Sequence, residues 1–360
     1  MRSQVKKPKL KKLVPKRRSK KAAAKAEANV EDESVPRITN ETVAEHREKV
    51  LGSARKYIYP LQHSKHKIVL ISTGLFIALV IGFFTYCTLA LYRFKSTSGF
   101  LYGVTRVIPF PIAKAGPDFV AYENYLFELR HYIHYYQTQQ KVNFNDTLGK
   151  QQLADYRTRA LQKVIDDAYI KELAAQHHIS ISDNELNNEI QLVRSQNRLG
   201  ANEKGFEDIL KDNFGWTLND FKRSLRQEML AEKLDAALDT ETSNKAQVAL
   251  NEINSGTSFG DAAKKFSDET NSKNNGGEYG FLIDRTNRDI SAQVVQTLFD
   301  LKPGQVSGII NTGPTLEIVK NLGEQNGKIK AAHIVFTLKD LNIFLNPLKD
   351  KQKTRVFVRL

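Results

Sequence analysis

An unbroken apolar run is the feature that most constrains how this chain can fold. Residues 68–92 contain 25 residues and no charged side chain. A helix rises about 1.5 Å per residue, so the run would reach about 37 Å, enough to cross a bilayer core of about 30 Å with some tilt. The sequence therefore predicts one transmembrane helix, which separates residues 1–67 from a much larger part, residues 93–360.

The basic charge of the chain is concentrated before this run. Residues 1–67 hold 19 Lys and Arg against 7 Asp and Glu, a net charge of +12, whereas the rest of the chain holds 35 against 33, a net +2. Basic residues before a first span keep that end in the cytoplasm, so we expect residues 93–360 to lie outside it. A cleaved signal peptide is the alternative, but its basic and apolar regions would both be unusually long.

The N-terminal tail is too basic to fold alone. Residues 2–25 carry 12 basic side chains and no acidic one, a composition that predicts disorder. Anionic lipid or nucleic acid could bind such a tail, although the absence of interleaved aromatic residues argues against nucleic acid. The alternative is a solvated tail that only sets the orientation of the span.

The part that follows the run begins with a connector and continues with helices. Three prolines in residues 93–117 forbid a continuous helix there, and residues 118–240 show apolar side chains at helical spacing. Helices are expected over about 122–139, 152–177, a stretch ending near 199–200, a short one around 206–214, and 217–238. The pairs Ser182 with Glu185 and Thr217 with Asp220 have the spacing of capping boxes.

The composition changes after Asp239, where short helices alternate with strand-like segments. Strands are expected at 279–283, 306–310, 316–322 and 329–338, and Asn326–Gly327 is a strong hairpin signal. Residues 339–360 predict a short helix and a final strand. The chain is therefore predicted to be an α+β protein, with one transmembrane helix, an all-helical domain (118–240) and a domain with a four-stranded antiparallel sheet (241–338).

Motifs in the last domain resemble a known family. They are Phe259 to Asp268 in the pattern F-x-x-x-A-x-x-F-S-D, the double glycine Gly276–Gly277, and Leu298 to Ser307 in the pattern L-F-x-L-x-x-G-x-x-S. In this order they resemble a parvulin-type peptidyl-prolyl isomerase domain. The helical part, with Ala160-Leu161 to Ala168 and His178 to Glu185, resembles the SurA/PrsA/PpiD class of bacterial envelope foldases.

The order of the strands departs from that family. A parvulin domain begins with a strand that carries His-Ile-Leu-Val, but the matching segment here, Ala332 to Phe336, comes last. Since the first and last strands are neighbours in the family's sheet, a hairpin at Asn326–Gly327 could join them. We infer a circular permutation; a truncated second repeat is the alternative, but the residues after Leu338 are too few to finish one.

The resemblance also implies a site. His333 takes the place of the family's first histidine, and Glu269 takes the place of its Cys or Asp; these two are the candidate catalytic residues. The candidate proline pocket consists of Tyr279, Ile290, Val294 and Thr315, although such residues are as often ordinary core. The family's second histidine is missing, because Thr315 or Leu316 stands there.

Two functions follow from these residues. The first is a membrane-anchored isomerase that acts on prolyl bonds of unfolded or newly translocated polypeptides. The second is a holdase with a degenerate site, and an envelope scaffold is a third, weaker alternative. The single cysteine, Cys87, excludes a disulfide within the chain, and without a Cys/His cluster no metal or cofactor is expected. A homodimer through the helical domain stays open.

Overall fold

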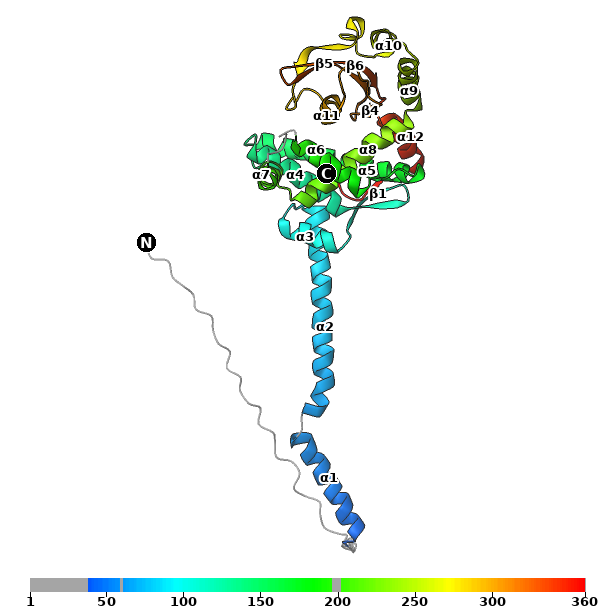
Figure 1. Ribbon diagram of the computed structural model, residues 1–360. Helices are drawn as coiled ribbons and strands as arrows, with labels where there is room; N and C mark the ends of the chain where they lie inside the picture. Colours follow the sequence, from blue (N-terminus) through cyan, green and yellow to red (C-terminus); the bar gives the residue numbers. More distant parts are fainter. Residues whose placement is uncertain (1–37, 59–60, 196–201, 360) are drawn as a thin grey trace, which may run out of the picture. The chain divides into compact units, whose positions relative to one another are not determined.

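The computed structural model describes residues 38–58, 61–195 and 202–359 (Figure 1). It divides into two compact units, residues 1–78 and 79–360, and each is described by itself. The predicted disordered tail, residues 1–67, lies outside the described residues over 1–37, but Asn40–Ile58 form a helix instead of a disordered segment. The predicted helix end near residues 199–200 also lies outside the described residues. The first unit contains helix α1 (Asn40–Ile58) and the first part of α2 (Leu61–Thr88).

Helix α2 and the π-helical turn η1 (Leu89–Arg93) contain the predicted span. Within the described residues, His66–Arg93 is the one helical stretch long and apolar enough to cross a membrane. The end of the predicted span is corrected, because Cys87, Ala90 and Leu91 are buried in protein. The large apolar side chains from Ile68 to Tyr86 are exposed, and 19 residues rise about 28 Å, close to the thickness of a bilayer core.

The residues predicted to be a connector are folded. They form helix α3 (Gly99–Val107) and strand β1 (Pro111–Ala115), which pairs with β2 (Asp118–Ala121). Ser98 caps α3 by accepting a hydrogen bond from the Leu101 N–H. The prolines do prevent one continuous helix, but they lie between ordered elements instead of in a linker.

The helical domain follows the predicted periodicity closely. Its helices are α4 (Tyr122–Thr138), α5 (Thr147–Gln176), α6 (Asp183–Ser195), α7 (Glu203–Ile209) with the π-helical turn η2 (Leu210–Phe214), and α8 (Leu218–Leu238). Both predicted capping boxes are confirmed. The Glu185 carboxylate accepts from the Ser182 N–H at 2.8 Å, and the Asp220 carboxylate accepts from the Thr217 N–H at 2.9 Å.

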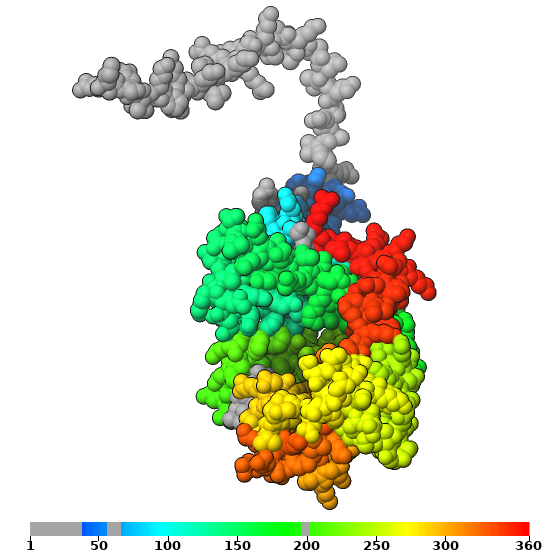
Figure 2. All heavy atoms as spheres, turned by 90° about the horizontal axis from the view of Figure 1, so that it is seen from above, coloured from blue at the N-terminus to red at the C-terminus, as the bar shows by residue number. Residues whose placement is uncertain are grey.

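The sequence predicted an all-helical domain, but the structure adds a small sheet that closes it. Its strand order is β2-β1-β7, and β7 (Arg355–Val356) comes from the other end of the chain. The preceding helix α12 (Asn342–Gln352) packs on α5, where Lys349 and Asp166 form an ion pair at 2.6 Å. Figure 2 shows this red C-terminal segment against the green helical residues. Two-residue strands carry no alternation that a sequence pattern could reveal.

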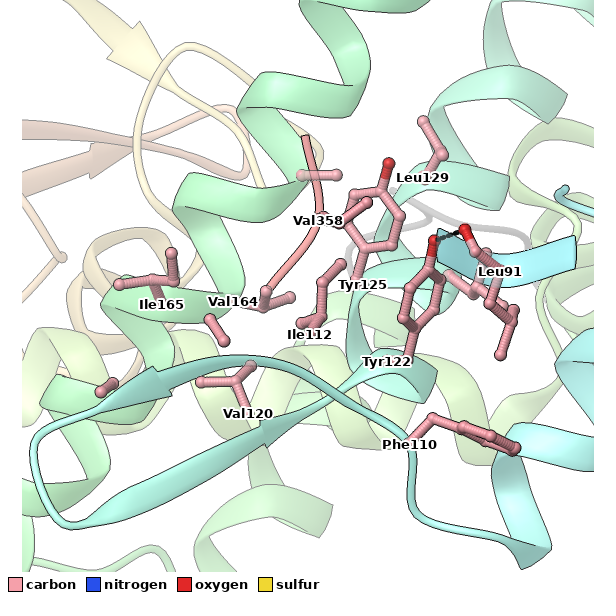
Figure 3. Packing of buried hydrophobic residues seen from close by; sticks show 14 of the residues in the cluster. Leu91, Phe110, Ile112, Val120, Tyr122, Tyr125, Leu129, Val164, Ile165 and Val358 are labelled. Carbon is pink, nitrogen blue, oxygen red and sulfur yellow. Dashed lines mark hydrogen bonds between the residues drawn. The ribbon is translucent and has the colours of Figure 1, made fainter. Parts of the chain in front are cut away.

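The core of the helical domain joins segments far apart in the sequence. Figure 3 shows its side chains meeting from the end of the apolar helix, the β1–β2 hairpin, α4, α5 and the C-terminal segment. The Tyr122 hydroxyl donates a hydrogen bond to the Leu91 carbonyl at 2.7 Å, which satisfies a buried polar group. The labelled members are Leu91, Phe110, Ile112, Val120, Tyr122, Tyr125, Leu129, Val164, Ile165 and Val358.

The second domain has the predicted four-stranded antiparallel sheet. Its elements are α9 (Thr240–Asn254), α10 (Phe259–Phe266), the 3₁₀ turn η3 (Lys273–Asn275), β3 (Glu278–Ile283), α11 (Ala292–Asp300), β4 (Ile310–Asn311), β5 (Thr315–Gln325) and β6 (Lys328–Thr337). The strand order is β3-β6-β5-β4. Strand β6 is thus central, as the inferred permutation requires. Asn326 and Gly327 both have positive φ, at 54° and 74°, which suits the predicted tight hairpin between β5 and β6.

One buried carboxylate joins the two ends of this domain. Asp239 caps α9 by accepting from the Thr242 N–H at 3.2 Å, and it also accepts from the Lys339 N–H at 3.0 Å. Burial alone would raise the pKa of Asp239, but the hydrogen bonds from Lys339 and Thr242 outweigh it and lower the pKa. The chain therefore leaves and re-enters the helical domain at one point, so residues 240–338 are an insertion in it.

Candidate functional site

Strand β6 places His333 in the middle of the sheet, where three chain segments meet. His333 lies opposite Val319 of β5, and its N–H donates to the Gly277 carbonyl at 2.8 Å on the other side. Gly277 has φ +79°, and a Cβ there would lie 2.4 Å from the His333 carbonyl oxygen. The double glycine therefore allows the loop to approach the backbone of His333 closely.

The Ser267–Asp268 pair explains how Glu269 reaches the histidine. The Asp268 N–H donates to the Val335 carbonyl at 2.8 Å, and the Ser267 hydroxyl accepts from the Val335 N–H at 3.2 Å. Residues 267 and 268 therefore continue, past the end of β3, the hydrogen bonding along the same edge of β6. The next residue, Glu269, is carried to the side of the sheet on which His333 lies.

The His333 imidazole lies between two carboxylates. Its Nε2 atom is 2.9 Å from Glu269 Oε2 and 3.3 Å from the Ser272 hydroxyl, and its Nδ1 atom is 3.4 Å from Glu317 Oε2. The Ser272 hydroxyl also donates to Glu269. The histidine residue is only 7% exposed. Both ring nitrogens therefore have a carboxylate oxygen within hydrogen-bonding distance.

Tyr279 forms the wall behind the imidazole. Its ring stacks on that of His333 with centroids 3.9 Å apart, and its hydroxyl donates to Glu317 Oε2 at 3.3 Å. Burial, then the charge of Glu317, raises the pKa of Tyr279 far above its usual range. The phenol therefore stays protonated and remains a hydrogen-bond donor. Phe281, whose ring is 5.9 Å from that of Tyr279, is exposed beside it.

The other predicted pocket residues adjoin this network, because Tyr279 packs against the cluster that contains Ile290 and Val294. Ile290 and Val294 are buried in a cluster between α11 and the sheet, a placement that favours the core role which the sequence left open. Thr315 is at the start of β5, and its hydroxyl donates to Glu317 Oε1 at 3.3 Å. Leu316 points into the opposite core cluster.

The residue of β5 that faces His333 is Glu317, which the sequence reasoning missed. The sequence predicted that Thr315 or Leu316 stands where the family has its second histidine. The signal was present, since the hairpin register pairs Val319 with His333, and alternation then places Glu317 on the same face. Ser272 and Phe281 were not predicted as site residues either, although Phe281 follows Gly276–Gly277 in the motif G-G-x-x-G-F, which resembles the family's pattern.

Comparison with known proteins agrees with this architecture. Residues 61–235 match the SurA-like N-terminal domain, and residues 229–322 match the PPIC-type PPIase domain. The second match ends before β6, so the strand that carries His333 lies outside it. The matched residues include α9, α10, β3, α11, β4 and most of β5, but not the strand of His333.

Foldases are the relatives that the comparison finds. The foldase protein PrsA of Staphylococcus aureus strain bovine RF122 / ET3-1 and that of strain Newman are each 26% identical over 209 residues, which cover 48% of this chain and 60% of the relative. The chain therefore spans less than two thirds of their length. The crystal structure of the foldase protein PrsA from Streptococcus pneumoniae is 18% identical, covers 54% of this chain and 75% of that chain, and has a TM-score of 0.19, too low to support an argument. The chain therefore contains a stretch similar to a SurA-like N-terminal domain, followed by a stretch similar to a PPIC-type PPIase domain.

Proposed function

We propose that this protein is a membrane-anchored foldase that isomerises prolyl bonds in polypeptides outside the cytoplasm. The observation that carries the proposal is the imidazole of His333, held between Glu269 and Glu317 in a PPIC-type domain. The +12 charge of residues 1–67 supports an N-terminus in the cytoplasm. Unfolded or newly translocated polypeptides are the proposed substrates.

The proposed mechanism needs no covalent step. Rotation about an X-Pro bond crosses a barrier of ~18–20 kcal/mol, and a catalyst must bind the twisted amide better than the planar one. The network of His333, Glu269 and Glu317 provides fixed charges and donors that need not reorganise during the rotation. Phe281 and Tyr279 offer an apolar surface for the proline ring.

A prolyl isomerisation assay on the full chain in detergent tests this function. We expect acceleration of cis–trans exchange in a proline tetrapeptide, measured by protease coupling or NMR exchange, and a loss of most of it in His333→Ala and Glu269→Ala. His177→Ala, which changes an exposed histidine of the helical domain, is the matched control. No acceleration over the uncatalysed rate, from a sample with intact folded-state spectra, would reject the isomerase function.

A specific observation also favours the holdase function. A cleft of about 500 Å³ lies between α6, α8 and α11. Phe221, Leu225 and Met229 of α8 line it at four-residue spacing, which places them on one ridge of the helix. Such an apolar groove can hold an extended polypeptide segment.

The same cleft carries unneutralised negative charge. Glu189, Glu228 and Glu232 line it, and burial, then the charges of Glu228 and Glu189, raises the pKa of Glu232 to about 7. Among the described residues no group of His, Cys, Asp and Glu is placed to hold a metal ion. A client segment with Lys or Arg beside apolar residues is the occupant that complements this lining.

Binding of a proline-free peptide separates the two functions. We expect a peptide of Lys and Leu residues to bind the full chain, and Leu225→Ala to weaken that binding about tenfold, by one lost apolar contact. Leu148→Ala, at an exposed leucine of α5, is the control. Equal binding by both variants would remove the cleft from the holdase proposal and would leave the isomerase assay unaffected.

A further inference from the structure

The last residues of the apolar helix form a joint that is packed into the folded domain. Cys87, Ala90 and Leu91 are buried in the domain core. The Tyr92 hydroxyl donates to the Pro111 carbonyl at 2.5 Å, and the Ser96 N–H donates to the Ala90 carbonyl at 2.9 Å. These contacts hold the last turns of the helix, which belong to the same compact unit, against the domain.

The chain after the joint runs back along the helix. The ring of Phe110, just after α3, lies 6.5 Å from the ring of Phe84 in α2. Phe84 precedes Leu91 by seven residues, which is about 10 Å along a helix. Phe110, itself part of the buried core, therefore lies beside the last turns of the apolar helix.

Apolar side chains are exposed along this returning segment. Phe94 is 73% exposed, Phe100 is 60% exposed and Val107 is 81% exposed. Phe100 and Val107 are seven residues apart on α3 and so share one face, whereas Leu101 and Thr105 on the other side are buried. Exposed apolar groups of this size, next to an exposed apolar helix, indicate an interaction surface.

The charge of the segment is uniformly positive. Residues 93–117 contain Arg93, Lys95, Arg106 and Lys114 and no Asp or Glu. The guanidinium of Arg106 lies 6.0 Å from the ring centroid of Tyr102. Basic and aromatic side chains around an apolar face are typical of helices that lie in the interface of an anionic membrane.

We propose that residues 94–110, the exit segment, lie in the membrane interface, with Phe94, Phe100 and Val107 between the lipid headgroups and acyl chains and the basic side chains at the phosphates. This contact would keep the start of the folded part at the membrane surface. The inference rests on the membrane anchoring of the proposed function, but not on isomerase activity.

Depth-dependent fluorescence quenching tests the exit segment. The full chain has one tryptophan, Trp216, so Phe100→Trp or Val107→Trp in a Trp216→Phe background gives one probe each. In vesicles of phosphatidylcholine and phosphatidylglycerol, lipids brominated high on the acyl chain should quench both probes about twofold, as expected for interfacial insertion. Phe281→Trp, at an exposed position of the parvulin-type domain, is the control that should not be quenched.

Resistance of the vesicle-bound chain to alkaline extraction separates the two proposals. Extraction of the chain would reject the anchor and the exit segment together. A retained chain in which the Phe100→Trp and Val107→Trp probes are both unquenched would overturn only the interfacial segment, and cross-linking between copies at these positions would assign the surface to a second chain. Quenching that persists in phosphatidylcholine alone and in Arg106→Gln would overturn the role given to the basic side chains.

Discussion

The His333 site and the cleft between α6, α8 and α11 use glutamates in opposite ways. At His333 both carboxylates, Glu269 and Glu317, have hydrogen-bonding partners within the domain. In the cleft, no ion pair joins Glu228 or Glu232 to any residue that the structure describes, and burial raises the pKa of Glu232. The first region is prepared for its task before a ligand arrives, whereas the second has a charge that an occupant can neutralise.

This difference shows what each region is suited to do. A paired, buried network loses little energy in reorganisation, so it suits the electrostatic support of a twisted amide. An open apolar groove with unpaired charge suits weak binding of many segments, since it specifies only a broad chemistry. Three substitutions can break or sharpen this comparison.

The largest effect is expected at the double glycine. Gly277→Ala would place a Cβ 2.4 Å from the His333 carbonyl oxygen, whereas at Gly276, which also has positive φ, the nearest atom would be 3.9 Å away. We expect kcat/KM for a proline peptide to fall about 100-fold in Gly277→Ala, because the histidine must move. Gly276→Ala should mainly lower the free energy of unfolding, by about 1 kcal/mol.

Parallel measurement of both functions completes this test. Binding of the Lys and Leu peptide in the cleft should not change in either glycine variant. If both variants lost isomerase activity equally, the close approach to His333 would not be the reason for the glycine.

A smaller effect is expected from the carboxylate that the sequence reasoning missed. Glu317→Gln keeps the size of the side chain but removes the charge that faces His333 Nδ1. A hydrogen bond to a charged group contributes about 1.5–3 kcal/mol, so we expect kcat/KM to fall about tenfold. Glu324→Gln, at an exposed position of the same strand, should change nothing. Full activity of Glu317→Gln would restrict the functional network to Glu269 and His333.

The smallest effect is expected in the cleft, and it depends on pH. The pKa of Glu232 rises from its usual 4.5 to about 7 in the folded protein. The contribution of Glu232 to the free energy of unfolding is therefore fully present below about pH 4.5 and is lost as the pH rises through 7. Glu232→Gln should therefore be the more stable protein at pH 8, by about 1 kcal/mol after discounting for solvent screening.

Urea unfolding at pH 5 and pH 8 measures this difference. The advantage of Glu232→Gln should shrink toward pH 5, and Glu207→Gln, at an exposed position of α7, should show no such trend. An advantage of equal size at both pH values would show that the cleft carries no strained charge.

Several elements could be predicted because their signals are local. The two capping boxes depend on residues three apart, and the hairpin at Asn326–Gly327 depends on two residues with positive φ. The central place of β6 was predicted from one motif, Ala332 to Phe336, that stood in an unusual position. The small β1–β7 pairing could not be predicted, because it joins two short segments more than 200 residues apart.

The sequence by itself determined the apolar helix, the periodic helices and the hairpin, whereas His333 and Glu269 were chosen from the resemblance to parvulin-type domains and stay predictions. Each of these follows from spacing or residue type over a few positions. Only the tertiary structure decided that Glu317 faces His333, that Val294 lies in the core, and that the apolar helix ends inside the domain at Cys87 to Leu91. These outcomes depend on the register and packing of segments distant in the chain, where burial outweighs the preference of any single residue.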